Sequence, residues 1–256
     1  MWASCGRTED EVILTPSTDE GHEQETDERA TMSITAPRTT DDTTHDLPDV
    51  VGHVRTALRT SAADLERALA ELRPDDRRRQ RALDRWFAGF AAQLRRHHDL
   101  IDTLVVPAVA GRGALDQRAL DVLAADHAWI DQLLGDLGDA LGVLSFGLGD
   151  EEHWVRRSVD LAMALRHAVD GQLEREQRQL TPLVAHRLSA GECDILRHEA
   201  MRRVAGGPVR FSLAWLYAHI DVTERQQVAA YAPTTRRLIW RSQRGVYERT
   251  SEAAFG

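Results

Sequence analysis

Four long amphipathic stretches occupy residues 47–188, and they constrain the fold more than any other feature of the 256-residue chain. In each of them apolar residues recur three or four positions apart, which places them on one face of an α-helix. The expected helices cover residues 48–72, 74–110, 116–144 and 151–188. Short turns containing Gly or Pro separate them, and short turns between long helices favour antiparallel neighbours. The sequence therefore predicts an all-α fold, in the form of an antiparallel up-down-up-down four-helix bundle.

The regions on either side of these stretches have different compositions. Residues 1–46 are rich in Thr, Asp, Glu and Ser and have no sustained periodicity, so we expect a disordered acidic tail. Residues 189–256 contain shorter helical patterns and many aromatic side chains. The simpler interpretation is a C-terminal helical extension packed on the bundle, and the alternative is a lid or a surface for a partner.

The charge of the chain is unevenly distributed. Residues 1–49 carry 13 Asp or Glu and three Arg, whereas residues 50–256 carry 28 Asp or Glu and 29 Arg. A nearly neutral body with an acidic tail offers no basic surface that would release counterions from nucleic acid. We therefore expect no nucleic-acid partner.

Membrane and secretory signals are absent from the sequence. No stretch approaches 18 consecutive apolar residues, and the first residues have neither a basic start nor an apolar segment of signal length. The two cysteines, Cys5 and Cys193, lie far apart and have no metal-binding spacing, so reduced thiols are the simplest interpretation. A cytoplasmic protein with no membrane partner is expected.

Two segments within the helical patterns carry possible ligand side chains. His97-His98-x-x-x-Asp102 begins ten residues before Pro107, and Gln172-x-x-x-Glu176 begins ten residues before Pro182. Residues four apart project from the same helix face, so each segment can present two donor atoms to one point. Facing helices of a bundle form metal sites in this way.

A third histidine is predicted to lie at the same depth. His97 precedes the turn at 111–113 by about fifteen residues and His127 follows it by about fifteen, so a rise of ~1.5 Å per residue puts both ~20 Å from that end. Glu176 continues an apolar stripe, and a buried carboxylate needs a partner. We therefore expect the heads of His97, His127 and Glu176 to lie within roughly 8 Å of one another, as ligands of one ion would with some relaxation.

Each of these residues also has a simpler interpretation. Glu176 alternatively pairs with Arg55 or His97 in a buried polar network, and His127 with a neighbouring carboxylate. Asp102 and Asp131 alternatively lie at solvated helix edges. Two other histidines, His53 and His167, are predicted to point away from the interior.

Together these segments resemble the hemerythrin-like (HHE cation-binding) family. The resemblance covers about residues 47–188 and is carried by the two proline-terminated segments, by His127 in Ala125-Asp126-His127, and by the helix lengths. It implies a four-helix bundle with a non-haem iron centre, mononuclear or dinuclear, bound by His and carboxylate side chains. It also implies a small ligand such as O2 or NO. The implied roles are the binding of such a gas or of peroxide, iron handling and redox sensing.

The chain departs from the family pattern at three positions. The family's His-x-x-x-Glu falls on His97-x-x-x-Ile101 in the second helix and on Gln172-x-x-x-Glu176 in the fourth. The first-helix histidine has no inward-facing match, and Arg55 is expected near its place. A small rotation of the second helix would turn His98 and Asp102 toward the site, where they could replace the missing ligands. The candidate metal ligands are therefore His97, His98, Asp102, His127 and Glu176.

Three functions follow from these residues, and the sequence does not decide between them or say whether the chain is an enzyme. The first is a hemerythrin-like iron protein that binds or senses O2, NO or peroxide. The second is an enzyme with a mononuclear non-haem iron site, for which two histidines and one carboxylate is a known composition. The third is an interaction module without metal, in which Arg55 neutralises Glu176.

Overall fold

The computed structural model describes residues 50–256, except residues 114, 209 and 232–233. In this part of the chain the regular secondary structure is helical throughout and contains no strand, as the sequence predicts. The predicted disordered tail of residues 1–46 lies outside the described residues. None of the helices described here is long and apolar enough to cross a membrane.

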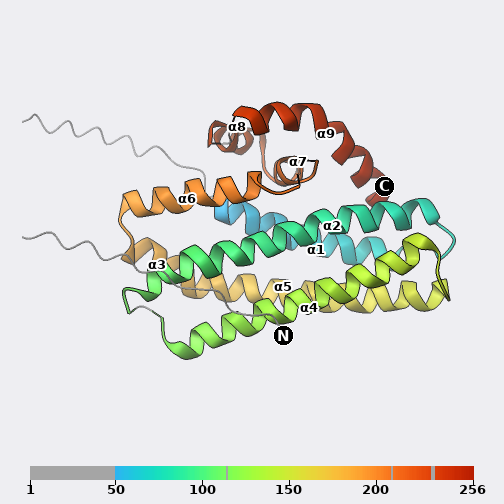
Figure 1. Ribbon diagram of the computed structural model, residues 1–256, viewed down its shortest axis with the longest axis horizontal. Coiled ribbons are helices and arrows are strands. Elements are labelled where there is room, and N and C mark those ends of the chain that lie inside the picture. Colours follow the sequence, from blue (N-terminus) through green and yellow to red (C-terminus); the bar gives the residue numbers. More distant parts are fainter. Residues whose placement is uncertain (1–49, 114, 209, 232–233) are drawn as a thin grey trace, which may run out of the picture. The chain divides into compact units, whose positions relative to one another are not determined.

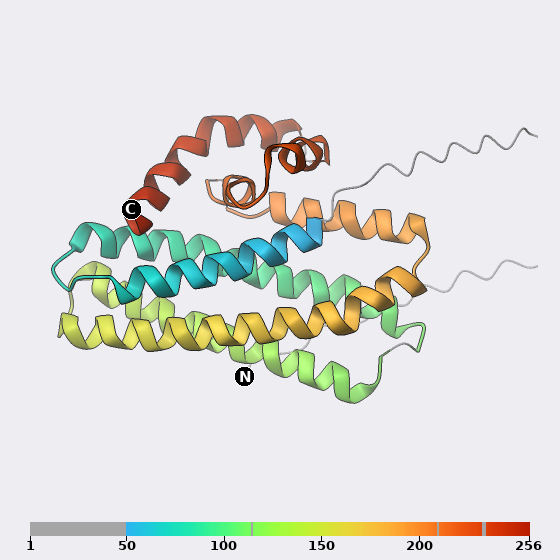
Figure 2. The same cartoon turned by 180° about the vertical axis from the view of Figure 1, so that it is seen from behind.

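Four long helices account for most of residues 50–187 (Figure 1). They are α1 (Val50–Ala70), α2 (Arg77–Leu100), α4 (Gln117–Phe146) and α5 (Glu151–Arg187). Their bounds agree with three of the four expected ranges to within two residues. Along their lengths, α1 packs against α5, α2 against α4, and α4 against α5 (Figure 2).

Local signals explain where these helices begin and end. Asp76, Asp116 and Asp150 stand before α2, α4 and α5, and the side chain of each accepts a hydrogen bond from the backbone N–H three residues later. Such a cap satisfies one of the four N–H groups that a helix start leaves unpaired. At the end of α4, Gly147 adopts the left-handed conformation (φ +71°), which costs glycine little.

The predicted helix over residues 74–110 is confirmed in extent from residue 77 to residue 110, but it contains a π-helical turn that the sequence pattern does not predict. It is divided into α2, a π-helix η1 (Ile101–Val105) and a short helix α3 (Val106–Ala110). The backbone N–H of Val106 donates to the carbonyl of Ile101, five residues back. Pro107 has no N–H for an i→i−4 bond and its ring crowds the preceding turn, and one wider turn accommodates it. This change of helical phase comes directly after His97 and His98.

The interior of the long helices is mostly aliphatic and aromatic. The largest fully buried side chains on them include Leu58, Leu65, Leu83, Phe90, Leu94, Ile130, Leu137, Leu141 and Leu144. A second, smaller apolar cluster lies where η1, α3 and the end of α5 meet α6, and contains Ile101, Val105, Val109, Leu180, Leu188 and Leu196. Residues of the two clusters flank the candidate polar residues in sequence, as Leu94 and Ile101 do on either side of His97 and His98.

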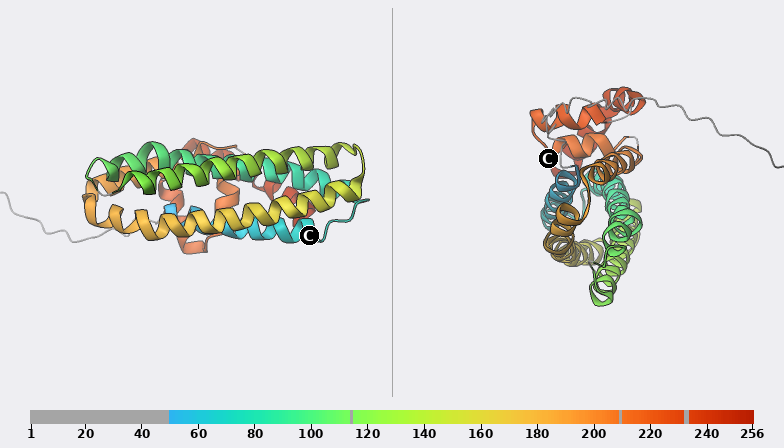
Figure 3. Two further views of the ribbon diagram at one scale, coloured as in Figure 1. Left: turned by 90° about the horizontal axis from the view of Figure 1, so that it is seen from below. Right: turned by 90° about the vertical axis from the view of Figure 1, so that its left-hand side faces the viewer.

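Residues 190–255 form α6 (Ala190–Ala205), α7 (Ser212–Ala218), α8 (Val222–Tyr231) and α9 (Thr234–Phe255). These helices lie on the side of α1 and α2, away from α4 and α5 (Figures 1 and 3). Trp215 of α7 is fully buried, and its indole N–H donates to Ser61 Oγ of α1 at 2.8 Å. A Cβ added at Gly89 of α2 would lie 2.3 Å from the Phe211 ring, so glycine permits this close approach. Aromatic packing thus joins this segment to the long helices.

Candidate functional site

A layer of five buried polar side chains interrupts the apolar interior of the long helices. It consists of His97 and His98 of α2, His127 of α4, and Gln172 and Glu176 of α5, and each residue is at most 5% exposed. We call these five residues the polar layer. The side chains from α2, α4 and α5 meet there, and an unpaired polar group at such depth is costly. The pairing within the layer therefore determines what it can do.

Glu176 is the centre of the layer. His97 Nε2 lies 2.8 Å from Glu176 Oε2, and His127 Nε2 lies 3.7 Å from Glu176 Oε1. His97 donates to the carboxylate, since an ionised carboxylate has no proton to give. The structure thus brings His97, His127 and Glu176 together, as the sequence predicts.

Gln172 connects the second histidine to the same carboxylate. Its amide nitrogen donates to Glu176 Oε1, and its carbonyl Oε1 lies 3.2 Å from His98 Nε2. Because the amide nitrogen is committed to Glu176, its oxygen accepts from His98 Nε2–H. The sequence pattern places Gln172 and Glu176 on one helix face as a pair of possible donors, but it does not predict that Gln172 connects Glu176 to His98.

His127 is held from the outside by Asp102. Asp102 Oδ2 lies 2.9 Å from His127 Nδ1, while the Asp102 residue itself is exposed. Asp102 is the second residue of η1 and lies four residues after His98, so it projects from the same helix face as His98 toward α4. The ring of His127 also stacks on that of His98, with centroids 4.1 Å apart. Asp102 therefore positions a histidine in the described arrangement and does not reach the centre of the layer.

The charges of the layer are coupled. Burial raises the pKa of Glu176, but His97 and His127 beside it outweigh this and hold its pKa below the usual range. Burial and the neighbouring His127 and His97 lower the pKa of His98 to about 3, so His98 is neutral at physiological pH. Burial alone would lower the pKa of His127, but the carboxylates of Glu176 and Asp102 raise it overall. The layer thus holds an ionised carboxylate close to a neutral His98 imidazole.

Other residues singled out in the sequence lie outside the layer. Arg55 does not pair with Glu176, because its guanidinium donates to Thr181 Oγ1 at 3.0 Å. Asp131 forms an exposed ion pair with Arg95 at 3.4 Å, in keeping with a helix edge. His167 is exposed as predicted.

His53 is mostly covered, contrary to the prediction that it points to solvent. Its Nδ1 lies 3.6 Å from Glu224 of α8. The helical period of α1 places His53 away from the long-helix interior correctly, but it does not foresee that the C-terminal helices cover this face.

The layer offers donor types that suit a non-haem metal. Three of its imidazole nitrogens have no hydrogen-bond partner among the described residues, namely His97 Nδ1, His98 Nδ1 and His127 Nε2, and the last of these faces Glu176. The Nδ1 of His127 is bound to a carboxylate. A metal-binding histidine is usually oriented in this way. Among the side chains that the structure describes, no group of three or more His, Cys, Asp or Glu is already spaced to hold a metal ion. An ion would replace the hydrogen bond between His97 and Glu176.

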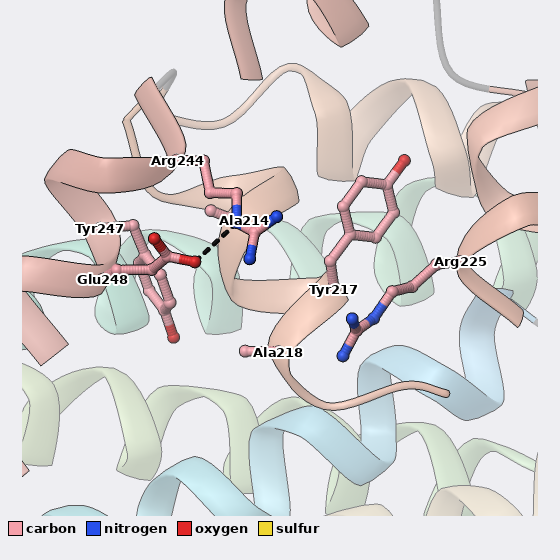
Figure 4. Close-up of a pocket in the computed structure, with 7 residues that line it drawn as sticks. All are labelled: Ala214, Tyr217, Ala218, Arg225, Arg244, Tyr247 and Glu248. Atoms are coloured by element: carbon pink, nitrogen blue, oxygen red, sulfur yellow. Dashed lines mark hydrogen bonds and ion pairs between the residues drawn. The ribbon is translucent and has the colours of Figure 1, made fainter. Parts of the chain in front are cut away.

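A separate cavity of about 140 Å³ lies among α7, α8 and α9, remote in sequence from the polar layer. Figure 4 shows Tyr217 and Arg225 on one side of it, and Arg244 hydrogen-bonded to Glu248 on the other. Because Arg244 is paired within its own helix, it is already neutralised. None of the described residues that line this cavity is a histidine.

In comparisons with known proteins, no family model, no curated protein and no solved structure matches the chain. The functional argument therefore depends on the residues of the layer.

Proposed function

We propose that α1, α2, α4 and α5 form an up-down-up-down four-helix bundle of the hemerythrin-like kind, and that its polar layer binds one non-haem iron ion. The ligands would be His97, His127 and Glu176, from three different helices. The proposal is supported by the convergence of these side chains on one carboxylate. Two histidines and one carboxylate suit a single ferrous ion with open positions better than a bridged pair.

The observation that carries the proposal is the unpartnered Nε2 of His127. A buried imidazole nitrogen without a hydrogen-bond partner is costly unless another group uses it. Its Nδ1–H is fixed by Asp102, so the lone pair of Nε2 is directed at the space beside Glu176. In this arrangement Asp102 would set the tautomer and raise the basicity of the ligand.

Bound iron would supply reversible binding of O2, NO or peroxide at its open positions. The protein's own part is to bind and orient. Glu176 provides the negative charge, His127 and His97 provide neutral nitrogens, and Gln172 holds the carboxylate in position through its amide. The side chains of the layer are themselves almost fully buried, which limits their contact with bulk water.

Metal analysis of Glu176→Gln tests this function. Protein purified without chelators and without a metal-binding tag should contain close to one iron per chain, and Glu176→Gln should lose most of it. The melting temperature should fall with the metal content, since an ion bound only to the folded state contributes to its stability. Glu174→Gln is the matched control, because Glu174 is exposed on the same helix. Iron content that is equal in wild type and Glu176→Gln would exclude Glu176 as a ligand.

One observation favours a second candidate, a polar layer that works without metal. Both oxygens of Glu176 already accept hydrogen bonds, from His97 and from Gln172. In this case the bundle is a metal-free module for contact with a partner, and its buried charge is neutralised by histidine, not by Arg55. Glu176→Gln would then leave the melting temperature unchanged or raise it, because it removes a buried charge. The same two measurements therefore separate the candidates.

A further inference from the structure

A cavity of about 260 Å³ lies between α1, η1, α5 and α6, next to the polar layer. It is formed where the C-terminal helix α6 covers the ends of the long helices, so neither part of the chain encloses it alone. Glu176 borders it on one side, and Arg55 and Arg197 border it from α1 and α6. This combination of residues indicates what could occupy it.

The wall of the cavity is mainly aliphatic. Leu100, Ile101, Leu180 and Leu196 line it and are themselves buried. A cavity with such walls favours a hydrocarbon chain over a polar molecule, because each CH2 transferred from water contributes about 0.8 kcal/mol. A water-sized group occupies ~30 Å³, so the cavity has room for about nine such groups. A ligand on the order of ten non-hydrogen atoms would therefore fill it.

The charged groups at the cavity select the head group of such a ligand. Among the residues that the structure describes, Arg55 has no carboxylate partner, and its guanidinium donates only to Thr181 Oγ1. Arg197 Nη1 donates to Asp194 Oδ1 at 2.8 Å, and a guanidinium has five N–H donors, so Arg197 has further donors for a ligand. Guanidinium groups bind carboxylates in preference to neutral oxygens. An anionic head is therefore favoured at this end.

A cationic ligand is not favoured, although Glu176 borders the cavity. Its carboxylate already accepts hydrogen bonds from His97 and Gln172 and is almost fully covered. Its charge is thus committed to the polar layer, whereas the charge of Arg55 is not committed to an acid.

We propose that this cavity binds an aliphatic carboxylate of about eight carbons. The hydrocarbon chain would lie against Ile101, Leu180 and Leu196, and the carboxylate would bind to Arg55 and Arg197 near Thr181. The site requires no iron, because none of these contacts uses a metal.

Titration of the full-length protein with octanoate in a calorimeter tests the proposal. Octanoate should bind saturably with one site per chain, and octylamine should not compete. Arg55→Gln should weaken octanoate binding about tenfold or more, the size of effect expected for a hydrogen bond to a charged group. The same variant should leave the weaker binding of octan-1-ol unchanged. Arg67→Gln is the matched control, since Arg67 is exposed on α1 and lies outside the cavity.

Filling the cavity gives an independent arm of the test. Val184→Phe should abolish the binding of both octanoate and octan-1-ol, because it occupies the space of the chain. If Val184→Phe fails to fold, Ala185→Phe serves in its place, as Ala185 lines the same cavity from an exposed position. Met163→Phe, on an exposed position of α5, is the control and should bind as wild type.

The proposal is overturned if octanoate does not bind, or if Arg55→Gln and the cavity-filling variant bind it as tightly as wild type. It is also overturned if octylamine binds as well as octanoate. Iron content measured on the same preparations keeps the two proposals apart. If the wild-type protein contains iron but does not bind octanoate, only the cavity proposal is overturned. If iron-free protein binds octanoate, the cavity proposal stands.

Discussion

The same helices have two interiors of opposite chemistry. At the beginning of α2 and the end of α4 the interior consists of Leu83, Phe90, Leu137, Leu141 and Leu144, all buried and apolar. At the end of α2 and the beginning of α4 it contains the polar layer around Glu176. In the apolar half each side chain contributes by leaving water, without a specific partner. In the polar layer each group needs its own hydrogen bond.

The difference shows where function is to be expected. Replacing a buried polar network by apolar residues of similar volume is often neutral or stabilising. Five polar residues at this depth are therefore not explained by stability. A histidine nitrogen that no hydrogen bond uses, beside an ionised carboxylate, is what a ligand site requires.

The largest expected effect lies in the apolar half. Phe90→Ala should lower the free energy of unfolding by about 3–5 kcal/mol, because it removes a fully buried ring and leaves a cavity. Iron content per folded chain should not change, since Phe90 lies seven residues before His97, outside the layer. Urea unfolding and metal analysis check both parts. Val122→Ala, at an exposed position of α4, should change stability by less than ~0.5 kcal/mol.

Because of the polar layer, the free energy of unfolding should depend on pH. His98 has a folded-state pKa of about 3 against 6.5 when unfolded, so its contribution is present above pH 6.5 and is lost as the pH falls toward 3. In iron-free protein this should remove about 4–5 kcal/mol across that window. His127 has a raised pKa and acts in the opposite sense, since its contribution is present below pH 6.5 and is lost as the pH rises through the folded value.

Urea unfolding at a series of pH values measures this effect. In His98→Asn, which does not titrate, the loss between pH 6.5 and 3 should be much smaller than in wild type. An equal slope in both proteins would mean that His98 is not held neutral by the fold.

A smaller effect on stability but a clear effect on iron is expected for Asp102→Asn. Asp102 is 49% exposed, so its loss should cost less than ~1 kcal/mol. Because it orients His127, iron affinity should fall about 10–100-fold. Competition with a chelator measures the affinity, and Asp99→Asn, an exposed aspartate on α2, is the control. Unchanged affinity would show that Asp102 does not act through His127.

The smallest effect is expected for Asp131→Asn. Asp131 lies one turn from His127 in sequence, but it forms an ion pair with Arg95 in which both side chains are half exposed. Such a pair contributes between zero and about 1 kcal/mol. Iron content and melting temperature should both match wild type. A loss of iron would show that Asp131 also contributes to iron binding.

Periodicity and short turns were enough to predict an all-α chain and the bounds of three long helices, because the spacing of apolar residues fixes which face of a helix is buried. The same reasoning predicted that His97, His127 and Glu176 would meet, since depth along a helix and angle around it follow from residue number alone. These are local properties of regular helices.

Only the tertiary structure decided the rest, because it depends on a break in regularity and on contacts between distant segments. The π-turn at Ile101–Val105 interrupts the regular phase of the helix that contains His97 and His98, and the spacing of apolar residues does not predict it. Gln172 acquires its role only when His98 is opposite it, and Arg55 turns to Thr181 instead of Glu176. The cavity beside the layer exists because α6 folds back onto the long helices, and helical periodicity contains no information about such a long-range contact.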